Sequence, residues 1–292
     1  MRSSINLWIQ GARPKTLPAA VAPVVVGAAC ARVSNSLQEN WSNAVLALIV
    51  SLALQVAVNY ANDYSDGIRG TDKNRVGPLR LVGSGSKSPA AVKFATILAF
   101  GVAAIFGLVL AATTSWWLLV VGVACLLAGW FYTGGKNPYG YLGLGEVFVF
   151  VFFGVVATMG TTFVVVQKLT RVSLLSSIAV GSLACALLAV NNLRDIAGDE
   201  IANKRTLAVR LGDVRARRFF VSLFVLAALA IVVLSISHAF ALLGMAGMCF
   251  AIKPIKRVLN GASGAALVEV LVMTGRVQIL VALTLSVGLV ID

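Results

Sequence analysis

Long apolar segments dominate this sequence and leave little of it for anything other than membrane-spanning helix. Most are about 17 to 25 residues long, which is the length that an α-helix needs to cross the hydrocarbon core of a bilayer. They lie near residues 17–33, 43–62, 90–112, 115–133, 146–166, 173–193, 218–237, 239–252 and 265–291. Only 12% of the residues are charged, against roughly 25% in a soluble domain. The sequence therefore predicts an all-α integral membrane protein with about nine transmembrane helices.

The basic residues indicate how the chain is oriented. The net charge of +13 would suit a nucleic-acid-binding protein, but 20 of the 24 Lys and Arg residues fall in segments that would share one side of the membrane with the N-terminus. The positive-inside rule then predicts a cytoplasmic N-terminus and a C-terminus on the other side of the plasma membrane. Residues 1–15 contain no small-residue cleavage site, so we expect this start to be retained. The bilayer, and no nucleic acid, is the expected partner.

A polar motif ends the sixth apolar segment and places Asn191, Asp195 and Asp199 four residues apart. On a helix these residues stack along one face, about 6 Å apart per step. Their hard oxygens suit Mg²⁺, which usually binds one or two carboxylates together with substrate phosphates. We therefore predict a metal site at the cytoplasmic end of this helix.

A second motif, at the end of the second apolar segment, repeats the four-residue step with Asn62 and Asp66. Gly67 and Gly70 weaken the helix, so a turn can return Asp72 toward Asp66. Two such motifs facing one cavity would hold a diphosphate through bridging metal ions. The chain is accordingly expected to be a single membrane domain, with similar halves near 10–140 and 141–255 and a last helix near 263–291.

Basic residues near the motifs are the predicted diphosphate contacts. Segment 73–87 is glycine-rich and carries spaced cations, among them Arg80, so it suits either a lid over phosphates or a solvated loop. Lys204 and Arg205 lie five and six residues past Asp199, within reach of an anion bound there. Lys136 follows the fourth apolar segment and is a further candidate. Beyond these, we interpret three cations as topology determinants: Arg215, Arg217 and Arg218.

The connection after the fourth apolar segment also gathers Tyr132, Tyr139 and Glu146 beside one membrane face. These residues are candidates for contact with an aromatic substrate, although interfacial tyrosines are common in membrane proteins. Glu269 and Arg276 lie inside the last apolar segment, where charge is costly. The sequence leaves open whether they face a cavity or lie nearer water.

The two motifs resemble those of the UbiA superfamily of membrane-embedded prenyltransferases, which take the forms Asn-Asp-x-x-Asp-x-x-x-Asp and Asp-x-x-x-Asp. Four separated stretches, at 11–18, 62–85, 132–154 and 191–212, are most similar to the branch that acts on 1,4-dihydroxy-2-naphthoate in menaquinone biosynthesis. The general pattern has an aspartate where this chain has Gly70, and the branch usually has glycine where this chain has Asn203.

The resemblance implies a helical bundle around a central cavity, in which a polyprenyl chain passes from its diphosphate to dihydroxynaphthoate with loss of carbon dioxide. By motif match, Asp66, Asp72, Asp195 and Asp199 would be catalytic Mg²⁺ ligands, supported by Asn62 and Asn191. The diphosphate would bind Arg80, Lys136, Lys204 and Arg205. Two alternatives stay open at this point, a prenyltransferase acting on 4-hydroxybenzoate or another phenol, and an ion-coupled transporter.

Overall fold

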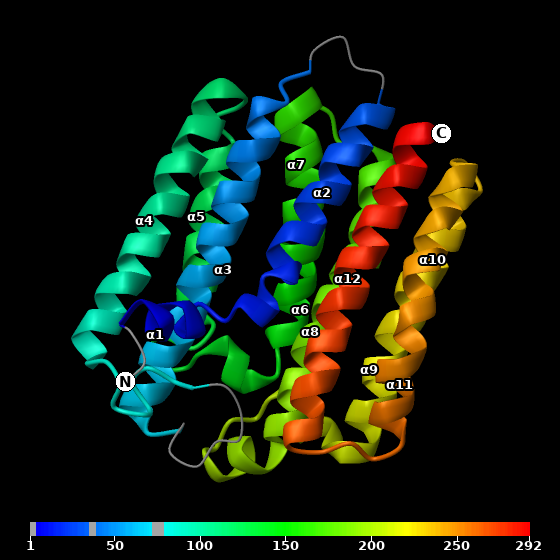
Figure 1. Cartoon of the computed structure of the whole chain (residues 1–292). Coiled ribbons are helices and arrows are strands. Elements are labelled where there is room, and N and C mark those ends of the chain that lie inside the picture. Colours follow the sequence, from blue (N-terminus) through cyan, green and yellow to red (C-terminus); the bar gives the residue numbers. More distant parts are fainter. Residues whose placement is uncertain (1–3, 35–38, 72–78) are drawn as a thin grey trace.

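The computed structural model of the chain describes residues 4–34, 39–71 and 79–292. Long helices run side by side as one bundle, and all regular secondary structure in the described residues is helical (Figure 1). The structure thus confirms the predicted all-α class.

The first part of the chain carries the first acidic motif on its third helix. Its helices are α1 (Ser4–Gly11), η1 (Pro14–Thr16), α2 (Pro18–Val33), α3 (Ser42–Arg69), α4 (Pro89–Thr113) and α5 (Leu118–Phe131). After the short η2 (Tyr139–Leu142), the chain continues as α6 (Gly145–Val149), the π-helical η3 (Phe150–Val156), α7 (Ala157–Val166), α8 (Arg171–Ile201) and α9 (Leu207–Ser235). It ends with η4 (Ala239–Leu243), α10 (Gly244–Met248), η5 (Cys249–Ala251), α11 (Ile252–Leu259) and α12 (Ala265–Ile291).

Seven helical spans in the described residues are long and apolar enough to cross a membrane. An eighth results if Ser4–Thr16 and Pro18–Val33, which meet at a 54° bend, form one broken span. The predicted segment that remains, at 115–133, corresponds to α5, which has only 14 residues. The expected count of nine is therefore approximate, because hydropathy finds apolar segments without measuring how far each helix extends.

Local capping explains where the helices that carry the site begin and end. Ser88 caps α4, because its side chain accepts a hydrogen bond from the Ala91 amide and Pro89 takes the first helical position. Gly70 ends α3 in the left-handed region, at φ 72°, where glycine has no steric penalty. The end of α3 is thus held to a defined turn just after Asp66.

Helix α8 lies at the centre of the bundle and is packed from several sides. A Cβ atom on Gly154 of η3 would lie 2.6 Å from the Gly181 Cα of α8, so the two backbones touch. On another side, α8 shares a core with α9 and α12 that includes Leu183, Phe220 and Val270. Close packing of this kind fixes the position of the second acidic motif, which occupies the last turns of α8.

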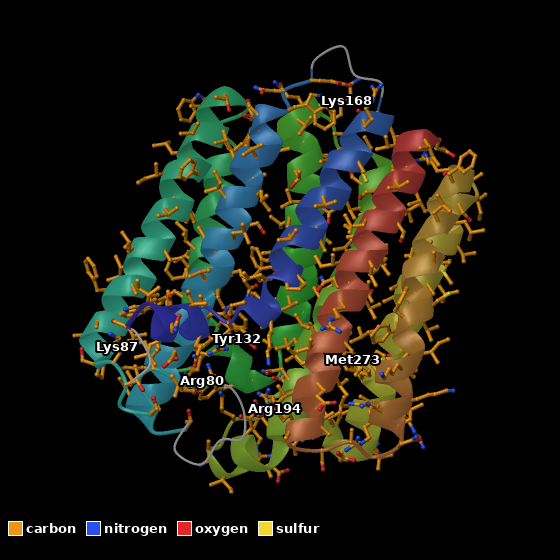
Figure 2. All side chains as sticks on the ribbon, in the orientation of Figure 1. Arg80, Lys87, Tyr132, Lys168, Arg194 and Met273 are labelled. Carbon is orange, nitrogen blue, oxygen red and sulfur yellow. The ribbon has the colours of Figure 1, made fainter. Side chains whose placement is uncertain are left out.

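The two acidic motifs lie at the same end of the bundle. Figure 2 shows Arg80, Lys87 and Arg194 near this end and Lys168 at the opposite one. The arrangement of charge fits the predicted topology, while the orientation in a membrane stays a prediction.

We expect single cysteines at Ser84 and Ser237 to react with an impermeant thiol reagent from opposite faces of sealed vesicles. Both positions are exposed. Ser237 directly precedes His238, whose Nδ1 lies 2.6 Å from a carboxylate oxygen of the C-terminal residue Asp292. Labelling at Ser237 therefore reports on the end of the bundle that holds the C-terminus, which is remote from the motifs. The four native cysteines are unpaired and Cys249 is exposed, so a background with all four replaced is the control. Labelling from the same face would contradict the predicted orientation.

Candidate active site

One lysine joins the two acidic motifs. Lys204 Nζ lies 3.1 Å from a carboxylate oxygen of Asp66 on α3 and 3.9 Å from one of Asp199 on α8. Both carboxylates therefore face the same small region, although they are 133 residues apart in the sequence. The structure brings together three of the predicted site residues.

Tyr141 of η2 completes this cluster and was not predicted individually. Its hydroxyl donates a hydrogen bond of 2.7 Å to Asp66, and Lys204 Nζ lies 4.7 Å from its ring centroid. Burial, together with the neighbouring Asp66 carboxylate, raises the pKa of Tyr141 above the usual value. The phenol therefore stays protonated at neutral pH and remains a donor to Asp66.

A left-handed residue aims Lys204 at the motifs. Asn203 has φ 55°, a conformation in which asparagine is tolerated better than most residues. The turn lets the Lys204 amide donate a 2.7 Å hydrogen bond to the Asp199 carbonyl. Asparagine thus replaces the glycine usual in the related branch without loss of the turn.

The remaining acid of the second motif is paired within its own helix. Arg194 donates two hydrogen bonds to Asp195, of 2.8 and 2.7 Å, and a third, of 2.8 Å, to Asn191 Oδ1. The side chain of Arg194 is almost completely buried. Sequence reasoning missed this arginine, although a cation inside the motif is itself a signal, because a buried cation needs an anionic partner.

Two neighbouring residues of the first motif, Asn62 and Asp63, have different roles: one is an oxygen ligand candidate and the other a structural acid. Asn62 Oδ1 accepts a 2.8 Å hydrogen bond from Thr133, which fixes its amide beside the connection after α5. Asp63 is fully buried and accepts hydrogen bonds from the Leu81 and Val82 amides, at 2.8 and 2.9 Å. Asp63 therefore anchors the segment that carries Arg80, a role that only the tertiary structure reveals.

The other predicted residues occupy varied positions. Arg80 is half-buried and lines the cavity described below. Lys136 and Arg205 are exposed at the same end of the molecule, and Arg205 contributes its carbonyl to Arg210. Asp72 lies outside the described residues.

Arg217 has a structural role that the sequence did not predict. Besides its ion pair with Asp213, it donates hydrogen bonds of 2.6 and 2.9 Å to the Val258 and Ala262 carbonyls. It thus ties α9 to the connection between α11 and α12, so the interpretation of Arg217 as a topology determinant alone is wrong. Arg215 is exposed nearby on α9.

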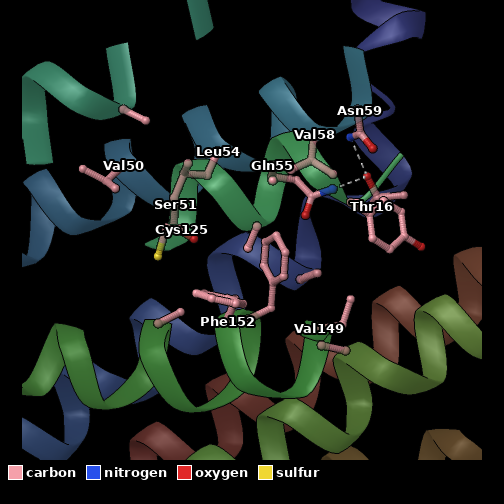
Figure 3. Close-up of a pocket in the computed structure, with 18 of the residues that line it drawn as sticks. Thr16, Val50, Ser51, Leu54, Gln55, Val58, Asn59, Cys125, Val149 and Phe152 are labelled. Atoms are coloured by element: carbon pink, nitrogen blue, oxygen red, sulfur yellow. Dashed lines mark hydrogen bonds between the residues drawn. The ribbon is translucent and has the colours of Figure 1, made fainter. Parts of the chain in front are cut away.

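A large cavity of about 1130 Å³ opens beside the motifs. Its polar end is lined by Arg13, Asn62, Arg80, Asn191 and Arg194. Farther in, the walls are apolar, as Figure 3 shows for Val50 and Leu54 of α3 opposite Phe152 of η3. A polar mouth that leads into a long apolar interior suits a ligand with an anionic head and a hydrocarbon tail.

Aromatic side chains line the cavity close to the motifs. Tyr132 and Tyr139 meet edge to face at 5.5 Å between ring centroids, and Tyr139 stacks on Phe148 at 3.8 Å. Glu146 is buried but does not line the cavity; its Oε1 accepts a 3.0 Å hydrogen bond from Asn192. The geometry therefore places two of the three aromatic-substrate candidates at the cavity wall and the third behind it.

The chemistry of the donors fits a divalent cation, although the acids are engaged with the protein's own cations. In the described part of the chain, no three Asp, Glu, His or Cys side chains gather closely enough to form a metal cluster. The two motifs do bring the amides of Asn62 and Asn191 to one cavity mouth, with carboxylates on the same helices beside it, and such hard oxygen ligands are those that Mg²⁺ prefers. Here Lys204 and Arg194 neutralise Asp66 and Asp195.

Comparison with known proteins places this arrangement in a family. Residues 20–289 match the model of the UbiA prenyltransferase family. The chain belongs to that family. It is 44% identical to a 1,4-dihydroxy-2-naphthoate octaprenyltransferase of Mycobacterium tuberculosis, over 97% of both chains. It is 40% identical to a protein of the same description from Escherichia coli, over 74% of this chain and 72% of the relative. This membership gives no support to the ion-coupled transporter.

Solved structures confirm the fold of the family in this chain. A UbiA homologue from Archaeoglobus fulgidus, bound to GPP and Mg²⁺, superposes with a TM-score of 0.72 at 15% identity and covers 98% of this chain and 100% of its own. An apo UbiA homologue from Aeropyrum pernix K1 gives a TM-score of 0.70 at 14% identity, over 98% and 99% of the two chains. At this identity the likeness establishes the helical architecture.

Proposed function

We propose that this protein transfers a polyprenyl chain from polyprenyl diphosphate to 1,4-dihydroxy-2-naphthoate. The observation that carries the proposal is that Lys204 contacts both Asp66 and Asp199 beside the polar end of a long apolar cavity. The names of the Mycobacterium tuberculosis and Escherichia coli relatives support this acceptor and a role in menaquinone biosynthesis.

The diphosphate would bind at the polar end of the cavity. Arg80 lines this end, and Lys204 lies beside it between two carboxylates. Asn62, Asn191 and the motif aspartates would hold Mg²⁺, which when bound supplies charge neutralisation to the departing diphosphate. The Lys204 ammonium, which contacts Asp66 at 3.1 Å, would reach phosphate oxygens bound at the same place. The chain's own cations then act at the place where negative charge develops.

The apolar part of the cavity would hold the prenyl chain and exclude water. As the bond between the allylic carbon and the diphosphate oxygen breaks, positive charge develops on that carbon. The rings of Tyr132 and Tyr139 line the cavity close to the motifs and can stabilise the cation through their faces. A carbon–carbon bond then forms with the naphthoate ring, which loses its carboxylate as carbon dioxide, and diphosphate leaves.

The test of this proposal is to supply purified protein with a polyprenyl diphosphate, Mg²⁺ and one aromatic acceptor at a time. We expect prenylated, decarboxylated naphthoquinol from dihydroxynaphthoate and little product from 4-hydroxybenzoate. Mass spectrometry identifies each product, and a reaction with chelator is the control. Turnover of 4-hydroxybenzoate in preference to the naphthoate would contradict the proposed acceptor while leaving prenyl transfer intact.

We expect Arg205→Ala to raise the KM for polyprenyl diphosphate or to lower kcat. Arg205 follows Lys204 and is exposed at the end of the bundle that carries the motifs, so its loss would remove a charge-assisted contact to phosphate. Arg215→Ala is the matched control, because Arg215 is also exposed but lies outside both acidic motifs. Arg217→Ala is unsuitable, since its ties to Val258 and Ala262 would be lost. Equal losses in both variants would indicate a general field effect.

A further inference from the structure

Arg276 is a charged residue in the membrane part of the bundle that the active site does not use. It lies in α12, eleven positions after the first residue, which is roughly 16 Å along the helix axis. Its side chain is left uncovered by the rest of the chain. Within residues 4–34, 39–71 and 79–292, no side chain or carbonyl pairs with it. A cation at such depth is costly unless something neutralises it.

Arg276 points into a groove of about 670 Å³ between α11 and α12, on the outside of the bundle. Each helix contributes one face to this groove, with residues spaced i, i+3, i+4 and i+7. These are Lys253, Lys256 and Arg257 of α11 with its C-cap Asn260, and Met273, Arg276, Val277 and Leu280 of α12. Figure 2 labels Met273 on α12. No lining residue is shared with the substrate cavity.

The groove has an excess of positive charge beside an apolar surface. Arg257 forms an ion pair with Glu269, which leaves the charges of Lys253, Lys256 and Arg276 uncompensated by the described acids. Phe250 and Ile252 are exposed where α11 begins and also line the groove. The combination matches a molecule with an anionic head and a hydrocarbon tail that lies in the surrounding bilayer.

We propose that this groove binds an anionic phospholipid. Its phosphate would lie between Lys253, Lys256 and Arg276, and an acyl chain would extend along Met273, Val277 and Leu280. Basic pockets between transmembrane helices bind anionic headgroups through the same combination of charge and apolar contact. A second copy of the chain is a poorer match, because 24 basic residues face only 11 acidic ones in this sequence. The lipid supplies the counter-charge that Arg276 lacks.

The experiment titrates full-length protein in neutral detergent with cardiolipin, phosphatidylglycerol or phosphatidylcholine and counts bound lipids by native mass spectrometry. We expect the two anionic lipids to bind and phosphatidylcholine to bind weakly. Lys253→Gln combined with Arg276→Gln should weaken anionic-lipid binding by roughly tenfold or more. Arg215→Gln combined with Arg218→Gln removes equal charge from exposed positions of α9 and should leave the affinity unchanged.

Several results would overturn the proposal. Equal weakening in both double variants would mean that general surface charge attracts the lipid. Displacement of the lipid by polyprenyl diphosphate from the same cations would make the groove a substrate site. Loss of a dimer in the first variant, in lipid-free detergent, would identify a second copy as the occupant. Thermal unfolding without lipid checks that both variants are folded.

Discussion

Replacing Asp66 with asparagine should lower kcat/KM by on the order of 100-fold or more, because a carboxylate is lost where the departing diphosphate needs neutralisation. The change is nearly isosteric, so packing at this buried position is retained. Asp66 also holds Lys204 and Tyr141, and a neutral amide binds the ammonium less strongly. Steady-state kinetics over a range of Mg²⁺ concentrations would measure the loss and any increase in the metal requirement.

Glu200→Gln is the matched control for this prediction. Glu200 directly follows Asp199 but is exposed. The substitution therefore removes the same charge from nearly the same place without changing the contacts among Asp66, Asp199, Lys204 and Tyr141. Asp195→Asn should resemble Asp66→Asn, because Asp195 is the buried acid of the second motif. Near-normal turnover in either motif variant, in folded protein with saturating Mg²⁺, would remove the metal assignment.

Replacing Gly122 with leucine should lower kcat/KM for long polyprenyl diphosphates by roughly tenfold or more, with a much smaller effect on geranyl diphosphate. Gly122 lies on α5 and lines the cavity, and a Cβ atom there would meet no atom within 4 Å. Leucine would therefore extend into the space proposed for the tail. It also favours the helix over glycine by roughly 0.5–1 kcal/mol, so folding should not suffer.

Gly101→Leu separates a blocked cavity from a changed helix. Gly101 of α4 also has open space around it but does not line the cavity. Competition between geranyl and long-chain diphosphates in one reaction, with products separated by mass, would give the ratio of kcat/KM directly. An equal decrease for both substrates in Gly122→Leu would mean that the tail does not occupy this part of the cavity.

The fold was largely predictable because membrane helices must satisfy their own backbone hydrogen bonds and present apolar side chains to lipid. Hydropathy therefore located the segments that became α2 through α12. It could not predict the shortness of α5 or the size of the 54° bend before α2, although Pro18 at the start of α2 favours a break there. The bend also involves the left-handed Arg13 at φ 53°, a local backbone conformation that hydropathy does not measure.

The candidate site was predictable where its residues share one helix and unpredictable where partners come from afar. The spacing of Asn191, Asp195 and Asp199 indicated one face of α8. The cation inside the motif was a signal for an anionic partner, but spacing did not point to the adjacent Asp195, because adjacent residues on a helix do not generally face each other. The role of Asp63 depends on amides from residues 81 and 82, a contact that no sequence spacing encodes.

The shortness of α5 determines how deep in the bilayer the reaction would take place. Its 14 residues span roughly 21 Å, whereas the hydrocarbon core is about 30 Å thick. Trp116 and Trp117 are exposed just before α5, at the end of the bundle remote from the motifs, where tryptophan marks the level of the headgroups. The other end of α5, followed by Tyr132, would then stop below the opposite headgroup layer. An allylic cation formed beside Tyr132 would lie beneath the membrane surface. The thickness of the surrounding bilayer would then affect the fraction of cations that react with water instead of with the aromatic acceptor.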